Sequence, residues 1–328
     1  KALRFNGRYE FVGRPITGPD GVKVFEALDF GPDDDPREEG SQVGIKYYGD
    51  RETFTRAART LRHTRLDEDL FANIRFFEAD STEASKNQIE HCIIVESPIL
   101  TLKKIASSMT KQNYRNDPNR LDAYLGKIQK IFKTIGSSIH YLHRQNVIHG
   151  NLSMESCGKF EDGWKVTGLI GAQSIGNPMT TLHMDTAAPP EAITFIGKQQ
   201  QNAQLFETYP VSPAIDIWAF GKLMFEVLVG KPLIPRDTEK HIRNDQRYLT
   251  ILGCWNEDDL VQAVSMMEDT GNGTLAADLI SHCLCKHPEQ RPQSMEEVLS
   301  HPFWAASSSQ RKTSSGNFGS SMKRRFLV

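Results

Sequence analysis

The polar side chains best placed for chemistry lie in the segment from His149 to Ser156, in the middle of the chain. Asn151 has the shape of an aspartate, but an amide cannot accept a proton at neutral pH. Ser156 is too short to present an oxygen to a metal ion as a longer amide side chain does. No Asp or Glu occurs between Asp162 and Asp185, although Mg²⁺ requires one or two carboxylates besides phosphate and water. We therefore expect that Asn151 does not act as a general base and that Ser156 does not bind a magnesium ion.

A second group of chemically active side chains is the run His282-Cys-Leu-Cys285-Lys-His287. Histidine and cysteine are the usual ligands of zinc. The apolar pattern, however, predicts a helix over Thr274–Cys285, and residues two apart on a helix point to different faces. We therefore expect this run to pack inside the protein and not to bind a metal.

The elements that must position these residues change in type along the chain. The first hundred residues predict strands and one helix, over Tyr9–Gly18, Val22–Phe30, Gln42–Tyr48, Glu52–Arg65 (the helix), Asn73–Ala79 and Ile89–Glu96. Later residues predict helices over Leu121–Leu142, Asp216–Leu228, Thr274–Cys285 and Ser294–Leu299. Ser294 and Glu297 have the spacing of a capping box. The order predicts an α+β protein with a small β-rich lobe and a larger, mainly helical lobe.

Composition limits the classes of partner. The chain has 328 residues and a formal net charge of -2, so no overall field attracts it to nucleic acid or to an anionic membrane. No window is apolar enough for membrane insertion. An odd count of five cysteines favours reduced thiols and a cytoplasmic or nuclear location. Because the sequence starts at Lys1 and not at Met, we expect it to be part of a longer chain.

Five motifs, read in order, resemble the landmarks of a protein kinase domain. They are Val43-Gly-Ile-Lys46, His149-Gly-Asn-Leu152, Pro189-Pro-Glu191, Asp216-Ile-Trp-Ala-Phe-Gly221 and Arg291-Pro292. The resemblance covers Tyr9 to Trp304, and the closing segment is most similar to serine/threonine kinases. It implies a two-lobed fold with an N-lobe at residues 1–97, a C-lobe at 98–304, and a serine-rich basic tail or linker at 305–328.

The resemblance assigns structural roles to five residues. Asp216 matches the aspartate that fixes the backbone of the catalytic loop. Glu191 and Arg291 match a buried ion pair of the helical lobe, which is expensive to break. His149 and Leu169 match two members of the regulatory spine. The fold alone explains why these residue types are present.

At the catalytic positions the chain departs from the family. Asn151 stands at the base aspartate, Ser153 at the lysine that contacts the γ-phosphate, Ser156 at the metal-binding asparagine and Gly168 at the metal-binding aspartate. The resemblance therefore implies no bound Mg²⁺ and no phosphoryl transfer.

The nucleotide-binding positions are degenerate as well. The three slots of the phosphate-binding glycines hold Thr17, Pro19 and Val22. Pro98 stands in the hinge where kinases donate a backbone N–H to adenine, and proline has none. Gly158 replaces the leucine of the adenine floor.

The family lysine is kept as Lys46, which we interpret as vestigial. Arg62 falls in the slot of its glutamate partner, and Glu52 and Glu68 are the nearest acids. We expect ATP binding to be weak or absent and no other cofactor to be required.

The sequence thus predicts a catalytically inactive pseudokinase that acts as a protein-interaction, scaffolding or allosteric module in signalling, with protein partners of unknown identity. One alternative is an atypical kinase, or another nucleotide-dependent transferase, that uses Asp162 or Glu155 for metal. Another is a sensor that binds ATP without metal through Lys46. The insert Lys198–Thr208, the tail Ala305–Val328 and the helical lobe are the surfaces where we would seek a partner.

Overall fold

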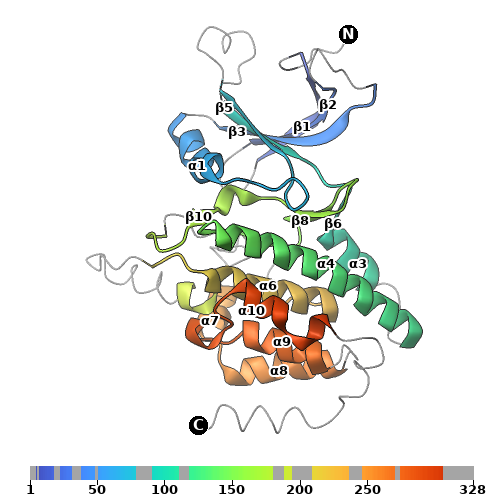
Figure 1. The fold of residues 1–328 in the computed structure, drawn as a ribbon, viewed down its shortest axis with the longest axis vertical. Helices are drawn as coiled ribbons and strands as arrows, with labels where there is room; N and C mark the ends of the chain where they lie inside the picture. Colours follow the sequence, from blue (N-terminus) through green and yellow to red (C-terminus); the bar gives the residue numbers. More distant parts are fainter. Residues whose placement is uncertain are drawn as a thin grey trace. The chain divides into compact units, whose positions relative to one another are not determined.

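The chain folds into two compact units of different composition (Figure 1). The computed structural model describes residues 5, 7–17, 23–31, 38–48, 51–78, 91–110, 118–179, 188–193, 209–235, 246–269 and 274–305. The first unit comprises Lys1–Leu100 and Gly158–Ile170, and the second comprises Thr101–Cys157 and Gly171–Val328. An antiparallel sheet dominates the first unit and helices dominate the second, which confirms the predicted α+β class.

The first unit is built on a five-stranded antiparallel sheet with the order β1-β2-β3-β5-β4. The strands are β1 (Tyr9–Thr17), β2 (Lys23–Asp29), β3 (Ser41–Tyr48), β4 (Ile74–Glu78) and β5 (His91–Glu96). In β5 the side chains alternate between two buried clusters, with Cys92 and Ile94 in one and Ile93 in the other. Because both faces of this strand are covered, its sequence is a continuous apolar run.

Helix α1 (Arg51–His63) packs beside this sheet. Its residues Phe54, Ala58 and Leu61 are buried, as their helical spacing predicts. The Phe54 ring lies edge-on to Tyr48 of β3 with ring centroids 5.8 Å apart. This contact fixes the face that the helix turns toward the sheet.

The second unit is a group of helices around α6 (Pro213–Val229). Among the other helices of its described residues are α3 (Leu102–Thr110), α4 (Pro118–Arg144), α7 (Gln246–Gly253), α8 (Glu257–Asp269), α9 (Thr274–Cys283) and α10 (Met295–Ser300). Helices α4, α8, α9 and α10 all contact α6 (Figure 1). This central position explains why the sequence of α6 is apolar nearly all round.

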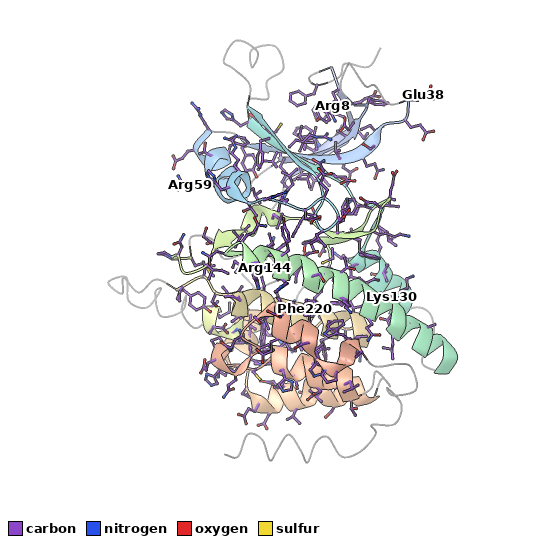
Figure 2. The ribbon with its side chains drawn as sticks, in the orientation of Figure 1. Arg8, Glu38, Arg59, Lys130, Arg144 and Phe220 are labelled. Carbon is purple, nitrogen blue, oxygen red and sulfur yellow. The ribbon has the colours of Figure 1, made fainter. Side chains whose placement is uncertain are left out.

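Two close contacts show how tightly α6 is packed. The ring of Phe220 meets Phe132 of α4 edge-on at 5.6 Å, inside the helical core (Figure 2). A Cβ added at Gly221 would lie 2.5 Å from Cβ of Cys283 on α9. Glycine at this position is therefore what allows the two helices to approach.

Short strands complete the fold: β6 (Leu100–Thr101), β7 (Val147–Ile148), β8 (Cys157–Lys159), β9 (Trp164–Val166) and β10 (Gln173–Ser174). Strand β7 pairs antiparallel with β10, so the segment that follows β7 starts from a fixed point. No helix in the described part of the chain is long and apolar enough to span a membrane.

A buried carboxylate that sequence analysis did not identify ties the first unit together. Asp29, at the end of β2, is almost fully buried and forms ion pairs with Arg8 and Arg75. Arg75 Nη1 donates to Asp29 Oδ2 at 2.6 Å, and the backbone N–H of Gly31 donates to Oδ1 at 2.9 Å. Burial by itself would raise the pKa of Asp29, but these hydrogen bonds outweigh it and lower the pKa to about 2.

We predict that Asp29→Asn lowers the free energy of unfolding at pH 7 by about 3 kcal/mol, because two partly exposed arginines lose their shared partner. The folded-state pKa lies below the usual value near 4, so this stabilisation is present above about pH 4 and is lost as the pH falls toward 2. Urea denaturation at pH 7 and at pH 3 measures both effects. An equal difference between wild type and variant at the two pH values would contradict the assignment.

Candidate functional site

The segment after β7 is held by one carboxylate from α6. Asp216 is fully buried; its Oδ2 accepts the backbone N–H of His149 at 2.7 Å and its Oδ1 accepts that of Gly150 at 2.9 Å. His143 Nε2, from the end of α4, lies 2.9 Å from Oδ2. Burial would raise the pKa of Asp216, but the contact with His143 and the backbone donors lower it below the usual range. The carboxylate therefore stays charged inside an apolar helix.

Gly150 occupies a position where no side chain fits in this backbone. Its φ is +70°, and an added Cβ would lie 2.4 Å from the carbonyl oxygen of Gly171. The left-handed conformation alone is costly for any residue with a Cβ. The loop thus turns sharply between His149 and Asn151, and Asn151 N donates to Nδ1 of His149 at 3.2 Å.

The two serines of the segment hydrogen-bond to each other. Ser153 N donates to Ser156 Oγ at 2.8 Å, and Ser156 N donates to Ser153 Oγ at 3.1 Å. Ser156 Oγ in turn donates to the carbonyl oxygen of Ser153 at 3.0 Å. The Ser156 side chain is buried, so its hydroxyl serves to close this turn.

The two acids that could replace a missing metal ligand both pair with lysines. Glu155 Oε1 lies 2.5 Å from Lys103 Nζ, on the surface of the second unit. In the first unit, Asp162 Oδ2 lies 2.6 Å from Nζ of the buried Lys165. Each carboxylate, although more than half exposed, is therefore paired with a lysine of its own unit.

The structure places Lys46 in the middle of β3, opposite Val24 of β2 and Ile93 of β5. Arg62 of α1 lies over two aromatic rings, with its guanidinium 5.4 Å from the centroid of Phe54 and 5.3 Å from that of Phe76. This contact gives Arg62 a structural role beside the sheet.

Three further predicted positions lie in or next to the first unit's strands. Thr17 ends β1 opposite Lys23. Gly168 has a φ of +79°, and Leu169 is buried after it. Pro19 and Val22 lie outside the described residues, as do residues 198–208 and 306–328.

Pro98 and Gly158 contact each other directly within the first unit. A Cβ added at Gly158 would lie 2.3 Å from Cβ of Pro98 and 2.8 Å from its Cγ. Backbone pairing next to them, from Ile99 N to the carbonyl of Lys159 at 2.9 Å, holds the two segments together. The proline ring thus fills the space into which a side chain at position 158 would project.

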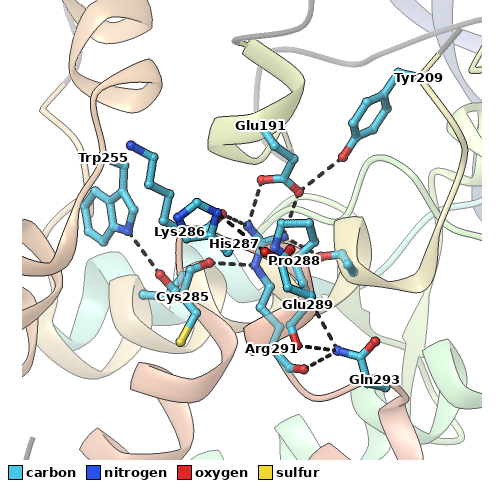
Figure 3. A network of polar contacts seen from close by, with 12 residues as sticks. Glu191, Tyr209, Trp255, Cys285, Lys286, His287, Pro288, Glu289, Arg291 and Gln293 are labelled. Atoms are coloured by element: carbon cyan, nitrogen blue, oxygen red, sulfur yellow. Dashed lines mark hydrogen bonds and ion pairs between the residues drawn. The ribbon is translucent and has the colours of Figure 1, made fainter. Parts of the chain in front are cut away.

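Arg291 forms the most extensive polar network of the second unit's described residues (Figure 3). Its Nη1 and Nη2 donate to the two carboxylate oxygens of Glu191 at 2.8 and 2.7 Å. Further donors reach the carbonyl oxygens of Cys285 at 2.7 Å, Lys286 at 2.8 Å and Ala214 at 3.1 Å. All five N–H donors of the guanidinium are therefore used.

The surroundings of this pair are also specific. Tyr209 donates its hydroxyl to Glu191 Oε1 at 3.2 Å, as Figure 3 shows. Burial, followed by the charge of Glu191, raises the pKa of Tyr209 far above its usual value. The guanidinium carbon of Arg291 lies 5.0 Å from the ring centroid of Trp218. The structure thus brings Glu191 and Arg291 together as a bidentate pair in which Arg291 is buried and Glu191 is partly exposed.

Part of the chain is similar to a known protein family. Residues 188–304 match the family model of the protein kinase domain. The match contains Glu191, Asp216 and Arg291, and the sheet followed by helices is consistent with the kinase fold.

Known kinases are distant relatives of the chain. It is 26% identical over 295 residues to mitogen-activated protein kinase 10 of Oryza sativa subsp. japonica, covering 81% of this chain and 44% of that protein. It is 28% identical over 177 residues to serine/threonine-protein kinase ksg1 of Schizosaccharomyces pombe, covering 52% and 27%. It is 26% identical over 170 residues to an Aurora kinase of Dictyostelium discoideum, covering 52% and 37%. The chain spans less than half the length of each.

We predict that Gly158→Ala lowers the free energy of unfolding by about 1–3 kcal/mol, because the new Cβ overpacks against Pro98. The matched control is Gly44→Ala in β3, where an added Cβ meets nothing closer than Ser97 Oγ at 3.9 Å. When Pro98 is also replaced by glycine, Gly158→Ala should cost less stability. Urea denaturation of Gly158→Ala, Gly44→Ala, Pro98→Gly and the double variant measures the coupling between positions 98 and 158. Equal losses for Gly158→Ala with and without Pro98 would contradict the contact.

Proposed function

We propose that this chain is a pseudokinase domain, which keeps a kinase-like fold, does not transfer phosphate, and acts as a protein-interaction, scaffolding or allosteric module in signalling. The observation that carries the proposal is that the Ser156 side chain hydrogen-bonds within the loop. Its hydroxyl both donates to and accepts from Ser153, so the residue at the metal-binding position is committed to the loop. With Asn151 at the base position, that position supplies no group that accepts a proton at neutral pH.

The residues at the metal-binding positions support the same proposal. Gly168 carries no side chain at the second metal position, and Asp162 and Glu155, the acids that could compensate, are paired with Lys165 and Lys103. Without Mg²⁺, the negative charge that develops on the transferred phosphoryl group loses its main stabilisation. Loss of the general base slows the reaction by a further factor of about 10²–10⁴. These residues do not fit a magnesium ion.

The adenine-binding positions do not fit a nucleotide either. Pro98 has no N–H for the adenine edge, and its ring lies where the side chain of a floor leucine at Gly158 would start. The lost leucine contact alone removes about 1.5–3 kcal/mol of apolar burial. We infer that ATP binds weakly or not at all.

A second candidate function rests on Lys46. The lysine is kept on β3, and a cation there could bind the phosphates of ATP without metal. A nucleotide sensor of this kind would need to bind ATP through contacts other than those to adenine at Pro98 and Gly158. The paired acids and the Ser153–Ser156 turn speak against the third candidate, an atypical kinase with displaced metal ligands.

We propose protein partners because the chain keeps the contacts that hold the helical unit together. The Asp216 and Arg291 networks stabilise the helical unit without contributing to catalysis. A domain that maintains its architecture while losing its chemistry retains its surface, and its activity then consists of binding. The partner, and any role of residues 198–208 and 305–328 in recruiting it, belong to this proposal.

We predict that ATP does not raise the thermal unfolding midpoint of the domain, with or without Mg²⁺, because neither the base nor the metal and hinge positions can hold it. A thermal-shift titration of wild type and Lys46→Ala measures this, with radiolabelled phosphate transfer alongside. A rise that requires Mg²⁺, or transfer that survives purification, would favour the enzyme. A metal-independent rise that Lys46→Ala abolishes would favour the sensor.

We predict that the partner captured with the full-length protein is retained by Lys46→Ala, because binding does not depend on the nucleotide positions. Deleting residues 198–208 or 306–328 should remove that partner if these segments recruit it. Affinity capture followed by quantification of the retained protein compares the variants. Loss of the partner in Lys46→Ala alone would contradict the scaffolding role.

A further inference from the structure

Two histidines and one aspartate form a cluster at the end of the kinase-like region that the proposed function does not use. Asp278 and His282 lie one turn apart on α9, and His301 precedes the 3-10 helix Pro302–Trp304. Each residue offers one ligand atom, and these atoms all lie within 4.8 Å of one another. The side chains of Asp278, His282 and His301 are 24%, 38% and 14% exposed, so an ion from solvent can reach them.

Hydrogen bonds already orient these side chains. His282 Nδ1 lies 2.8 Å from the backbone carbonyl oxygen of Asp278, and because a carbonyl only accepts, Nδ1 carries the hydrogen. The lone pair of His282 is then on Nε2, and the protonated Nδ1 also lies 3.8 Å from Asp278 Oδ1. His301 Nδ1 accepts the backbone N–H of Phe303 at 3.1 Å, and its Nε2 donates to Asp278 Oδ2 at 3.0 Å.

We propose that this cluster binds a divalent transition-metal ion of the zinc class through Asp278, His282 and His301. Two imidazoles and one carboxylate are a ligand set that zinc accepts, with a fourth position left for water. A histidine whose second nitrogen donates to a backbone carbonyl, as in His282, is the usual arrangement around a metal. The site would connect α9 to the segment that ends the kinase-like region.

This assignment of His282 departs from the expectation, drawn from the sequence, that the run from His282 to His287 binds no metal. The neighbouring cysteines are not ligands in this proposal. Cys283 is fully buried and faces Gly221 of α6, where an added Cβ would lie 2.5 Å from Cys283 Cβ. Cys285 is buried, and its Sγ donates to the carbonyl oxygen of Ser281 at 3.4 Å. Since neither cysteine belongs to the group of ligand atoms around Asp278, the first coordination shell should contain nitrogen and oxygen alone.

Binding of the metal ion moves one proton on His301. The ion replaces the hydrogen between His301 Nε2 and Asp278 Oδ2, and the imidazole keeps one proton by moving it to Nδ1. The hydrogen bond from Phe303 N to Nδ1 is then lost. Binding is therefore accompanied by a small rearrangement of the 3-10 helix, which limits the affinity to less than that of a preformed structural site.

The test is a titration of the full chain with ZnCl₂ alone. When zinc exceeds its Kd by 100-fold, the thermal midpoint should rise by about 5 °C. His282→Gln should abolish the rise, whereas the control His287→Gln, an exposed histidine outside the cluster, should keep it. MgCl₂ at the same concentration should leave the midpoint unchanged, because Mg²⁺ prefers oxygen ligands.

X-ray absorption on the wild-type zinc complex gives a readout that does not depend on how a variant folds. Only nitrogen and oxygen neighbours at about 2.0–2.2 Å are expected. The absence of a zinc-induced rise, an equal rise with magnesium, a rise that persists in His282→Gln, or sulfur in the first shell would each overturn the proposal.

Discussion

The charge of Asp216 is the constraint on which the middle of the chain depends. A carboxylate buried in an apolar helix must be surrounded by donors, because an unpaired buried charge is among the most destabilising features a fold can contain. The donors are the backbone N–H groups of His149 and Gly150, with His143 alongside. The loop is thus fixed at His149 and Gly150 through its backbone, so the side chain at Asn151 can change without loss of this anchor.

Arg291 acts on the second unit in a comparable way. Its guanidinium joins Glu191, the start of α6 at Ala214, and the carbonyls after α9. These segments are far apart in sequence, and one planar cation with five donors satisfies all of them. Both networks join backbone or buried groups, and neither includes a nucleotide, so these contacts hold the fold whether or not a nucleotide binds.

The sequence predicted the elements whose periodicity is strong. The apolar face of α4 from Leu125 to Leu142 and the nearly continuous core helix α6 lie as expected. At α10, Ser294 accepts the N–H of Glu297, but Glu297 reaches back to Gln293 N and not to Ser294. Helices α3, α7 and α8 were not predicted, although the N-terminus of α8 carries a signal: Asn256 followed by three acids in the first turn. The Asp29 cluster gives no local signal, because its arginines are 21 and 46 residues away.

Pro98 and Gly158 show what sequence positions cannot reveal. From the sequence alone, the resemblance to kinases implies that Pro98 and Gly158 each remove one contact to adenine, independently of each other. In the structure they are one steric unit, since the proline ring fills the space that a Cβ at 158 would need. Restoring either position alone would then produce a clash or a void, and not a binding surface. On the proposed function, the two positions therefore depart from nucleotide binding together, and a single substitution at either one would disturb the packing.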